Sequence, residues 1–236
     1  MSKSKVLCLH GVHTSGEVFT SIPSAAKSLI DLIGTQIFRV QLGQLVTRLE
    51  EEQNLELHFI DGLIESDGEE DIRGVFPGPY YMWSSVSSDS KLANFQSGKQ
   101  ALDFVQDVIL EDGPFDGVIG FSEGAALAYA LLLRYASEHP LEPPSTICKW
   151  VALFSCVGID LEQHRLDKES LLSIPSLHVL DQSDTRLGTG GTNVACEPGT
   201  AQWIWHNRGH AIPRDTATVT RIMDAVRVLQ HRALVF

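Results

Sequence analysis

The stretch that decides the fold of this sequence is Val118-Ile119-Gly120-Phe121-Ser122-Glu123-Gly124-Ala125-Ala126. It places the pattern Gly-x-Ser-x-Gly between an apolar run that favours a strand and residues 125–134, which favour a helix. A serine in such a strand-to-helix turn projects from a strained backbone, and bulky residues two positions away would clash with the neighbouring strand and helix. The pattern therefore predicts a nucleophilic serine at Ser122.

The helix expected after Ser122 gives the pattern a second chemical reason. Its first N–H groups and its dipole favour negative charge beside the serine, and the N–H of Glu123 is a candidate oxyanion donor. The plainer interpretation is a glycine-flanked turn in which Ser122 only caps a helix. The candidate partners of Ser122 elsewhere in the chain favour the nucleophile.

Short apolar runs alternate with helical patterns along the chain, as is typical of a parallel sheet covered by helices. The sequence predicts an α/β fold over residues 1–236 as a single domain, with a mostly parallel sheet covered on both faces. Strands are expected at residues 5–9, 55–60, 115–120, 149–155, 176–180 and 201–205. Helices are expected at residues 17–33, 100–110, 125–134 and 216–232.

The loop after the first expected strand reads Leu9-His10-Gly11-Val12-His13-Thr14-Ser15-Gly16. In α/β-hydrolases a second oxyanion N–H comes from a loop after an early strand, and a glycine lets the backbone approach the substrate closely. We expect the N–H of Val12 to be this donor, with that of His13 as the neighbouring possibility. We interpret His10 as a hydrogen-bonded loop anchor and His13 as a residue at the mouth of the site.

The candidate base follows the last expected strand. In this fold the chain order is serine, acid, histidine, so His10 and His13 lie on the wrong side of Ser122. The segment Gly209-His210-Ala211-Ile212-Pro213 places His210 on a loop before the final helix, facing the elbow. We prefer His210 as the base, with His206 at the strand end as the competitor.

Two carboxylates follow the expected strand at residues 176–180 and compete for the role of the acid. Asp184 lies in the loop, where it could reach the far nitrogen of His210, whereas Asp181 is closer to the strand end. The acid fixes the tautomer of the imidazole and stabilises the imidazolium. We favour Asp184, and we interpret Asp116, at the start of its strand, as structural.

Residues 61–90 interrupt the alternation with Gly, Pro, Ser and acidic residues around embedded aromatics. A loop of this length in a compact domain is usually functional or mobile. Its aromatic residues either line an apolar acyl pocket under a lid or pin the loop to the core, and the sequence leaves both open. The candidate pocket residues are His13, Phe76, Tyr80, Tyr81 and Trp83.

Composition excludes several classes of protein. Eighteen Lys and Arg against 30 Asp and Glu give a net charge of −12, which argues against a nucleic-acid protein and against docking on an anionic membrane. No apolar stretch approaches the length of a membrane span, and no two of the four cysteines have zinc or redox spacing. We expect a cytoplasmic protein with free thiols, no metal and no organic cofactor.

The chain resembles the fungal FSH (family of serine hydrolases) branch of the α/β-hydrolases over nearly its whole length. The resemblance implies an α/β-hydrolase fold and a triad of Ser122, Asp184 and His210, although this chain has Asp181 where a glycine is common and Thr185 where a proline is common. The matching segments are Val6-Leu7-Cys8-Leu9-His10-Gly11 with Ser15-Gly16, Phe38-Arg39, Phe59-Ile60-Asp61-Gly62, Gly78-Pro79-Tyr80-Tyr81 with Trp83, Gly120-Phe121-Ser122-Glu123-Gly124, Ile174-Pro175-Ser176-Leu177-His178-Val179 and Gly209-His210.

Members of that family include short-chain esterases and thioesterases that release polyketides from fungal synthases, such as the lovastatin-pathway enzyme. Residues 61–90 are similar to the latter group. The resemblance therefore implies hydrolysis of an ester or thioester, with an acyl-carrier domain of a synthase as a possible partner. An acyltransferase on the same triad, a general short-chain carboxylesterase and a non-catalytic binding protein that kept the fold stay open as alternatives.

Overall fold

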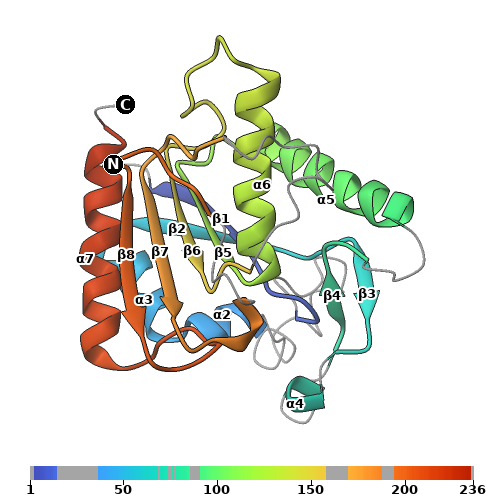
Figure 1. The fold of residues 1–236 in the computed structure, drawn as a ribbon. Coiled ribbons are helices and arrows are strands. Elements are labelled where there is room, and N and C mark those ends of the chain that lie inside the picture. Colours follow the sequence, from blue (N-terminus) through green and yellow to red (C-terminus); the bar gives the residue numbers. More distant parts are fainter. Residues whose placement is uncertain are drawn as a thin grey trace, which may run out of the picture.

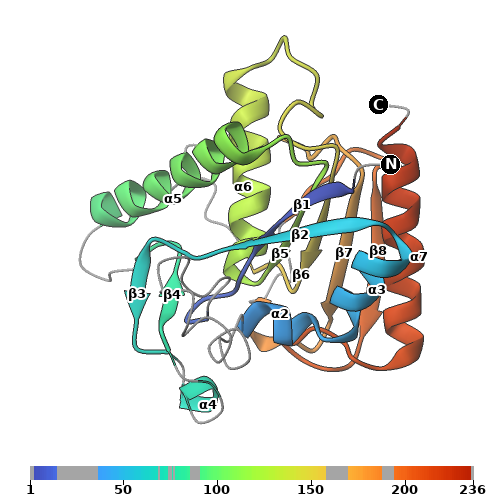
Figure 2. The ribbon, with the colours of Figure 1, turned by 180° about the vertical axis from the view of Figure 1, so that it is seen from behind.

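A computed structural model of the chain describes residues 3–14, 37–68, 70–73, 76, 78–85, 91–157, 170–187 and 194–234. Its centre is a six-stranded sheet with helices on both faces, visible from opposite sides in Figures 1 and 2. All neighbouring strands are parallel, in the order β2-β1-β5-β6-β7-β8. Their bounds are β1 (Ser4–Leu9), β2 (Leu55–Ile60), β5 (Gly117–Phe121), β6 (Trp150–Phe154), β7 (Ser176–Asp181) and β8 (Ala201–His206).

Alternate residues of the inner strands face two different helical layers, because side chains along a strand point to opposite faces of the sheet. Leu7 and Leu9 belong to the core under α5 (Lys91–Asp112) and α6 (Glu123–Glu138), and Val6 and Cys8 to the core under the other layer. That second layer consists of α2 (Ile37–Leu42), α3 (Gln44–Glu52) and α7 (Thr216–Arg232). The predicted α/β architecture, with a sheet covered on both faces, is confirmed.

The expected elements agree with the observed ones most closely where the hydrophobic period is strong. All six expected strands are present, and α7 has the expected bounds. Helices α5 and α6 extend beyond the expected residues 100–110 and 125–134, because their polar outer turns carry no apolar stripe that marks an end. The helix expected at residues 17–33 lies outside the described residues.

The segment expected as an irregular loop at residues 61–90 contains regular structure. Strands β3 (Ile64–Ser66) and β4 (Tyr80–Met82) form a two-stranded antiparallel sheet, and a short helix α4 (Glu70–Arg73) lies between them in the sequence. Figure 1 shows this small sheet beside the main one, below α5. Each strand has only three residues, too few for an alternating pattern to predict it.

The order of the strands places the carboxyl ends of β1 and β5 together. From β1 the chain goes to β2 on one side, and β5 to β8 extend the sheet on the other, so the strand order reverses between β1 and β5. Open α/β sheets bind ligands outside the carboxyl ends of their strands at such a switch point. The pairing of Leu9 with Gly120 brings the loop after β1 beside the turn after β5.

Candidate active site

Ser122 occupies the sharp turn between β5 and α6. Its φ of 54° lies in the left-handed region, which costs a non-glycine residue about 1–3 kcal/mol and persists only where the surroundings hold it. One contact that holds this conformation is the hydrogen bond from the N–H of Ser122 to the carbonyl of Phe154, at 2.9 Å. Ser122 stands at the N-cap of α6, but its side chain makes no capping hydrogen bond. The interpretation of Ser122 as a helix cap is therefore not supported.

The glycines around Ser122 have no room for a side chain. A Cβ on Gly120 would lie 2.6 Å from Cα of Ala125, and one on Gly124 would lie 2.3 Å from the carbonyl oxygen of Leu9. Both contacts are to backbone, which cannot move aside as a side chain can. The close approach of α6 to the end of β1 therefore explains why the pattern requires glycine at these two positions.

The three residues predicted as a triad lie in one chain of hydrogen bonds. The Oγ of Ser122 is 2.8 Å from Nε2 of His210, and Nδ1 of His210 is 2.7 Å from Oδ2 of Asp184. If Ser122 donates its hydroxyl hydrogen, His210 accepts on Nε2 and donates from Nδ1 to the carboxylate. The side chains of His210 and Asp184 are 9% and 1% exposed, so this chain is shielded from water.

Asp181, the competitor for the acid, has a different set of contacts. Its Oδ1 accepts from the N–H and the hydroxyl of Ser183, at 2.8 and 2.7 Å, and its Oδ2 accepts from the N–H of Gly209 at 2.7 Å. These hydrogen bonds, led by that of the Ser183 hydroxyl, lower the pKa of Asp181. Asp181 thus holds the backbone beside His210, whereas Asp184 contacts the imidazole ring itself.

His206, the competitor for the base, lies at the end of β8. Its Nδ1 accepts the N–H of Arg208 at 3.2 Å, a contact within its own turn. Partial burial lowers the pKa of His206. The histidine that is hydrogen-bonded to Ser122 is His210.

His10 is buried at the end of β1 and joins three segments. Its Nδ1 lies 2.6 Å from the carbonyl oxygen of Gly11 and so donates to it, while its Nε2 accepts the N–H of Gly62 at 2.9 Å. Its ring stacks on Trp83, with centroids 4.8 Å apart. Burial lowers the pKa of His10 to about 4, so the ring is neutral, as this hydrogen-bond pattern requires. These contacts fit a loop anchor.

The loop after β1 lies directly against the elbow. A Cβ on Gly11 would come within 2.9 Å of the Phe121 ring and 3.4 Å of Cβ of Ser122. His13 follows with a φ of 55°, so the loop turns sharply past the serine. The expected oxyanion donors, the N–H groups of Val12 and Glu123, therefore belong to backbone on either side of Ser122.

The aromatic residues of the insertion differ in their burial. Trp83 is 1% exposed, and its Nε1 donates to the carbonyl of His10 at 2.8 Å, so it fastens the insertion to the core. Tyr80 is buried, and its hydroxyl donates to the carbonyl of Phe76. Tyr81 and His13 are half-buried, and the backbone of Tyr81 pairs with Thr14 of the loop after β1. Phe76 is also half-buried, so of the expected pocket residues Phe76, Tyr81 and His13 keep exposed surface that a ligand could contact.

Two contacts near the site carry no signal in the sequence. Asp181 binding Gly209 depends on how two loops meet, although the Asp-x-Ser spacing is typical of an aspartate that turns back on its own loop. The side chain of Glu123 accepts hydrogen bonds from Trp83 and Ser84, forty residues earlier in the chain. Nothing in the local pattern around Glu123 indicates that partner.

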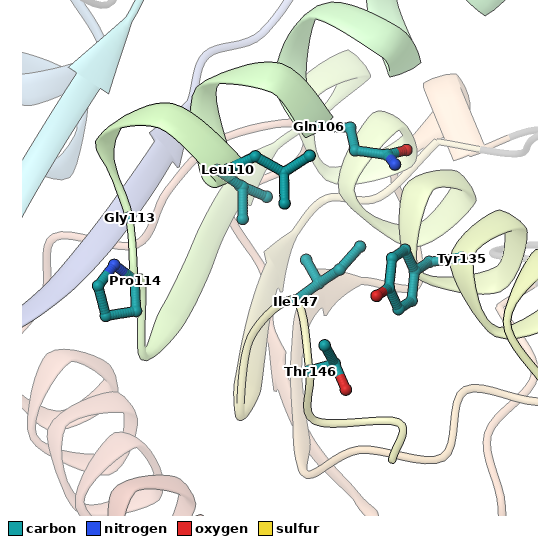
Figure 3. A pocket seen from close by; sticks show the side chains of 8 residues that line it. Gln106, Leu110, Gly113, Pro114, Tyr135, Thr146 and Ile147 are labelled. Atoms are coloured by element: carbon teal, nitrogen blue, oxygen red, sulfur yellow. The ribbon is translucent and has the colours of Figure 1, made fainter. Parts of the chain in front are cut away.

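A cavity lies away from this cluster, beside the far ends of α5 and α6. Figure 3 shows its lining, which includes Gln106, Leu110, Tyr135 and Ile147, around about 290 Å³. Tyr135 lies in the last turns of α6, whereas Ser122 precedes the first, so this cavity opens at the opposite edge of the sheet. It is not the site of the hydrogen-bonded chain at Ser122.

The described part of the chain has neither a metal-binding cluster nor a membrane-spanning helix. Its residues contain no group of three or more His, Cys, Asp or Glu side chains that could hold a metal ion. None of its helices combines the length and the apolar character needed to cross a membrane. The four cysteines are all free thiols.

Comparison with known proteins adds independent findings. The family model described as serine hydrolase (FSH1) matches residues 1–222. A hydrolase named phiM from Talaromyces stipitatus is 27% identical, covering 94% of this chain and 86% of that protein. An esterase named FPY3 from Fusarium mangiferae is 25% identical, covering 98% and 99%.

Solved structures share the fold at low sequence identity. The structure of YahD with malic acid has a TM-score of 0.57 at 13% identity and covers 96% of this chain and 94% of that one. A carboxylesterase from Bacillus cereus has a TM-score of 0.52 at 14% identity and covers 98% and 89%. The α/β-hydrolase fold expected from the sequence is confirmed.

Proposed function

Because the chain belongs to the serine hydrolase (FSH1) family, we propose that Ser122, His210 and Asp184 are the catalytic triad through which it cleaves an ester or thioester. The observation that carries the proposal is the hydrogen-bonded chain from Ser122 Oγ to His210 at 2.8 Å and from His210 to Asp184 at 2.7 Å. This order of nucleophile, base and orienting carboxylate activates a serine in hydrolases on several folds.

Acylation begins when Ser122 Oγ attacks the carbonyl carbon of the substrate and its proton passes to Nε2 of His210. The carbonyl oxygen becomes an oxyanion, which the N–H groups of Val12 and Glu123 stabilise. The tetrahedral intermediate then expels the alcohol or thiol, which takes the proton from His210. Asp184 stabilises the imidazolium throughout and stays ionised.

Deacylation repeats the same steps with water. His210 takes a proton from the water as its oxygen attacks the acyl-enzyme, and the oxyanion forms again between the same N–H groups. Collapse releases the carboxylic acid and returns the proton to Ser122 Oγ. The triad is restored without a metal or an organic cofactor.

The finer proposal is release of an acyl or polyketide chain from a carrier protein in fungal secondary metabolism. It rests on the similarity of residues 61–90 to polyketide-releasing thioesterases and on the fungal relatives of the chain. In this proposal His13, Tyr80, Tyr81 and Trp83 shape the acyl pocket, with Tyr81 and His13 in contact with the chain. An acyl-carrier domain and a cytoplasmic location belong to the same proposal.

The experiment that tests the triad is labelling with a fluorophosphonate, followed by intact mass. One adduct is expected on the wild type and none on Ser122→Ala. His206→Gln is the matched control, because it alters a neighbouring histidine outside the hydrogen-bonded chain and should label normally. A wild type that takes no adduct would argue for the non-catalytic binding protein instead.

Turnover assays then separate the alternatives that share the triad. Acyl pantetheine thioesters and p-nitrophenyl esters of equal chain length compare thioesterase with carboxylesterase activity. Product analysis with and without an added alcohol or amine distinguishes hydrolysis from acyl transfer. Preference for short esters with no thioester turnover would contradict release from a carrier protein.

A further inference from the structure

The side chain of Glu123, the residue after the proposed nucleophile, is a buried carboxylate that accepts three hydrogen bonds. Its Oε2 accepts the N–H of Trp83 at 3.2 Å. Its Oε1 accepts the N–H and the hydroxyl of Ser84, at 3.0 and 3.1 Å. The proposed mechanism uses only the backbone N–H of Glu123, so these contacts need a separate explanation.

The same stretch of the insertion also binds the loop after β1. We call residues 81–84 the clamp segment. At one end the backbone of Tyr81 exchanges two hydrogen bonds with Thr14, at 2.6 and 3.2 Å. In its middle, the indole of Trp83 donates to the carbonyl of His10 at 2.8 Å. The clamp segment therefore contacts the backbone on both sides of Val12, and at its other end the side chain of Glu123.

We infer that Glu123 is a positioning residue for the oxyanion hole, whose carboxylate fastens the clamp segment to the start of α6 and so fixes the distance between the N–H groups of Val12 and Glu123. The inference rests on the proposed function. Val12 lies in the loop after β1, whereas Glu123 begins α6, and the described pairing of β1 with β5 ends earlier, at Leu9 and Gly120. The clamp segment adds a hydrogen-bonded connection to the direct packing of α6 on the end of β1, because it joins the loop after β1 to Glu123 through contacts of 2.6–3.2 Å.

A buried negative charge on Glu123 costs free energy, so its presence beside the oxyanion hole needs a compensating effect. Burial raises the pKa of Glu123 above its ordinary value, and the hydrogen bonds from Ser84 and Trp83, together with His13, reduce this rise without cancelling it. A negative charge near a developing oxyanion opposes the transition state. The three hydrogen-bond donors stabilise that charge. The geometry that they impose on the oxyanion hole explains a carboxylate at this position.

The substitution Glu123→Gln tests the inference with almost no change in volume. An amide has one acceptor oxygen, so it can serve Trp83 or Ser84, while its NH₂ group faces the donor of the other. We expect kcat to fall about ten- to hundredfold, because oxyanion donors must meet a developing charge closely. KM should change less than kcat, because the Glu123 carboxylate contacts the backbone of Trp83 and Ser84 and not the acyl chain. Tyr81 stays held by its own backbone pairing with Thr14.

The affinity of a boronic acid inhibitor is a second measurement, and it does not change when part of the protein is unfolded. The inhibitor forms a tetrahedral adduct on Ser122 whose oxygen occupies the oxyanion hole. Its affinity should fall in Glu123→Gln by the same factor as kcat/KM. Both quantities are expressed per active site titrated with the fluorophosphonate, so that unfolded molecules do not count.

Two further variants complete the design. Glu138→Gln makes the same change at the exposed far end of α6, and it should leave kcat and boronate affinity within about twofold of the wild type. Ser84→Ala removes the hydroxyl but leaves both backbone donors, so its loss should be smaller than that of Glu123→Gln. Combined with Glu123→Gln it should add little, because both changes weaken one connection.

The possible outcomes separate this inference from the proposed function. If the wild type is active and Glu123→Gln has the same kcat and the same boronate affinity, the inference is overturned and the proposed triad is unaffected. A higher kcat in Glu123→Gln also overturns it, because the charge would then act mainly against the oxyanion. A wild type that neither labels nor turns over substrate removes the proposed function itself.

Discussion

Gly209, the residue before His210, donates a hydrogen bond of 2.7 Å from its N–H to Oδ2 of Asp181. Gly209 has a φ of 63°, so the turn that presents His210 uses a left-handed residue as well as this acceptor. Asp184 contacts the ring of the same histidine at 2.7 Å. Two carboxylates, one at the end of β7 and the other in the loop after it, therefore hold one histidine, Asp181 through the backbone of Gly209 and Asp184 through the imidazole ring.

This division predicts unequal effects of the same substitution. In Asp184→Asn the amide offers N–H to Nδ1 and favours the wrong tautomer, so kcat should fall about 10⁴-fold. In Asp181→Asn the amide oxygen can still accept the N–H of Gly209, so the loss should stay below about tenfold. Steady-state kinetics on one ester measures both, with circular dichroism as the control for folding. A larger loss in Asp181→Asn would assign the acid to Asp181 instead.

Alanine at the two glycines near Ser122 should differ in severity. In Gly124→Ala the new Cβ would lie 2.3 Å from the carbonyl oxygen of Leu9, so the elbow must distort and kcat should fall at least about 100-fold. In Gly11→Ala the nearest atom, at 2.9 Å, belongs to the ring of Phe121, which can shift. We expect a milder loss there. Thermal unfolding should rank the two variants in the same order, and a reversed order would contradict the account of the elbow.

His10 should make the protein less stable in acid. Burial lowers its pKa from 6.5 to about 4, so between these values the unfolded chain binds a proton that the folded chain excludes. Stability is therefore full above pH 6.5 and falls as the pH drops. For His10 alone the loss between pH 7 and pH 5 is about 2 kcal/mol.

His10→Gln is the variant that tests this slope. Its amide can donate to the carbonyl of Gly11 and accept from Gly62 without titrating. Urea unfolding at the two pH values should show a drop smaller than that of the wild type by about 2 kcal/mol. His178, whose pKa burial also lowers to about 4, keeps its own contribution in both proteins. If the free energy of unfolding decreases between pH 7 and pH 5 by the same amount in His10→Gln as in the wild type, His10 is not the cause of the decrease.

Tyr81 should affect long acyl chains more than short ones if it lines the acyl pocket. Tyr81→Ala is expected to lower kcat/KM on an octanoyl ester about tenfold, by the loss of apolar contact, and to spare an acetyl ester. Tyr135→Ala, which alters the cavity at the far ends of α5 and α6, serves as the control and should change neither. Equal losses on both esters in Tyr81→Ala would contradict the pocket and leave Tyr81 as a residue that pins the insertion.

The sequence predicts the main sheet well because its inner strands are buried on both faces and its edge strand β2 alternates. Residues 176–180 form a largely apolar run and residues 55–60 alternate apolar and polar side chains, and the structure has strands at both. The elbow is also predictable from the sequence. A Cβ on Gly120 or Gly124 would lie 2.6 or 2.3 Å from backbone atoms, so no residue other than glycine fits at either position. Local pattern and tertiary packing agree at these places.

The small sheet in the insertion has no such local signature. Strand β4 is held by pairing with β3 and with Thr14, and these contacts come from distant parts of the chain. The choice between Asp181 and Asp184 is open in the sequence for a related reason, because their distances to His210 depend on how the loops after β7 and β8 meet. The partners of the Glu123 carboxylate are likewise fixed only by tertiary structure.

The order of Ser122, Asp184 and His210 along the chain bears on how the protein is made. Ser122 leaves the ribosome well before His210, which lies 88 residues later and reaches it only after β7 and β8 have joined the sheet. Until then the nascent chain carries an ordinary alcohol in place of a nucleophile. With the proposed triad, reactivity toward acyl groups therefore arises late in synthesis, and we expect partly folded chains not to attack the thioesters and esters around them.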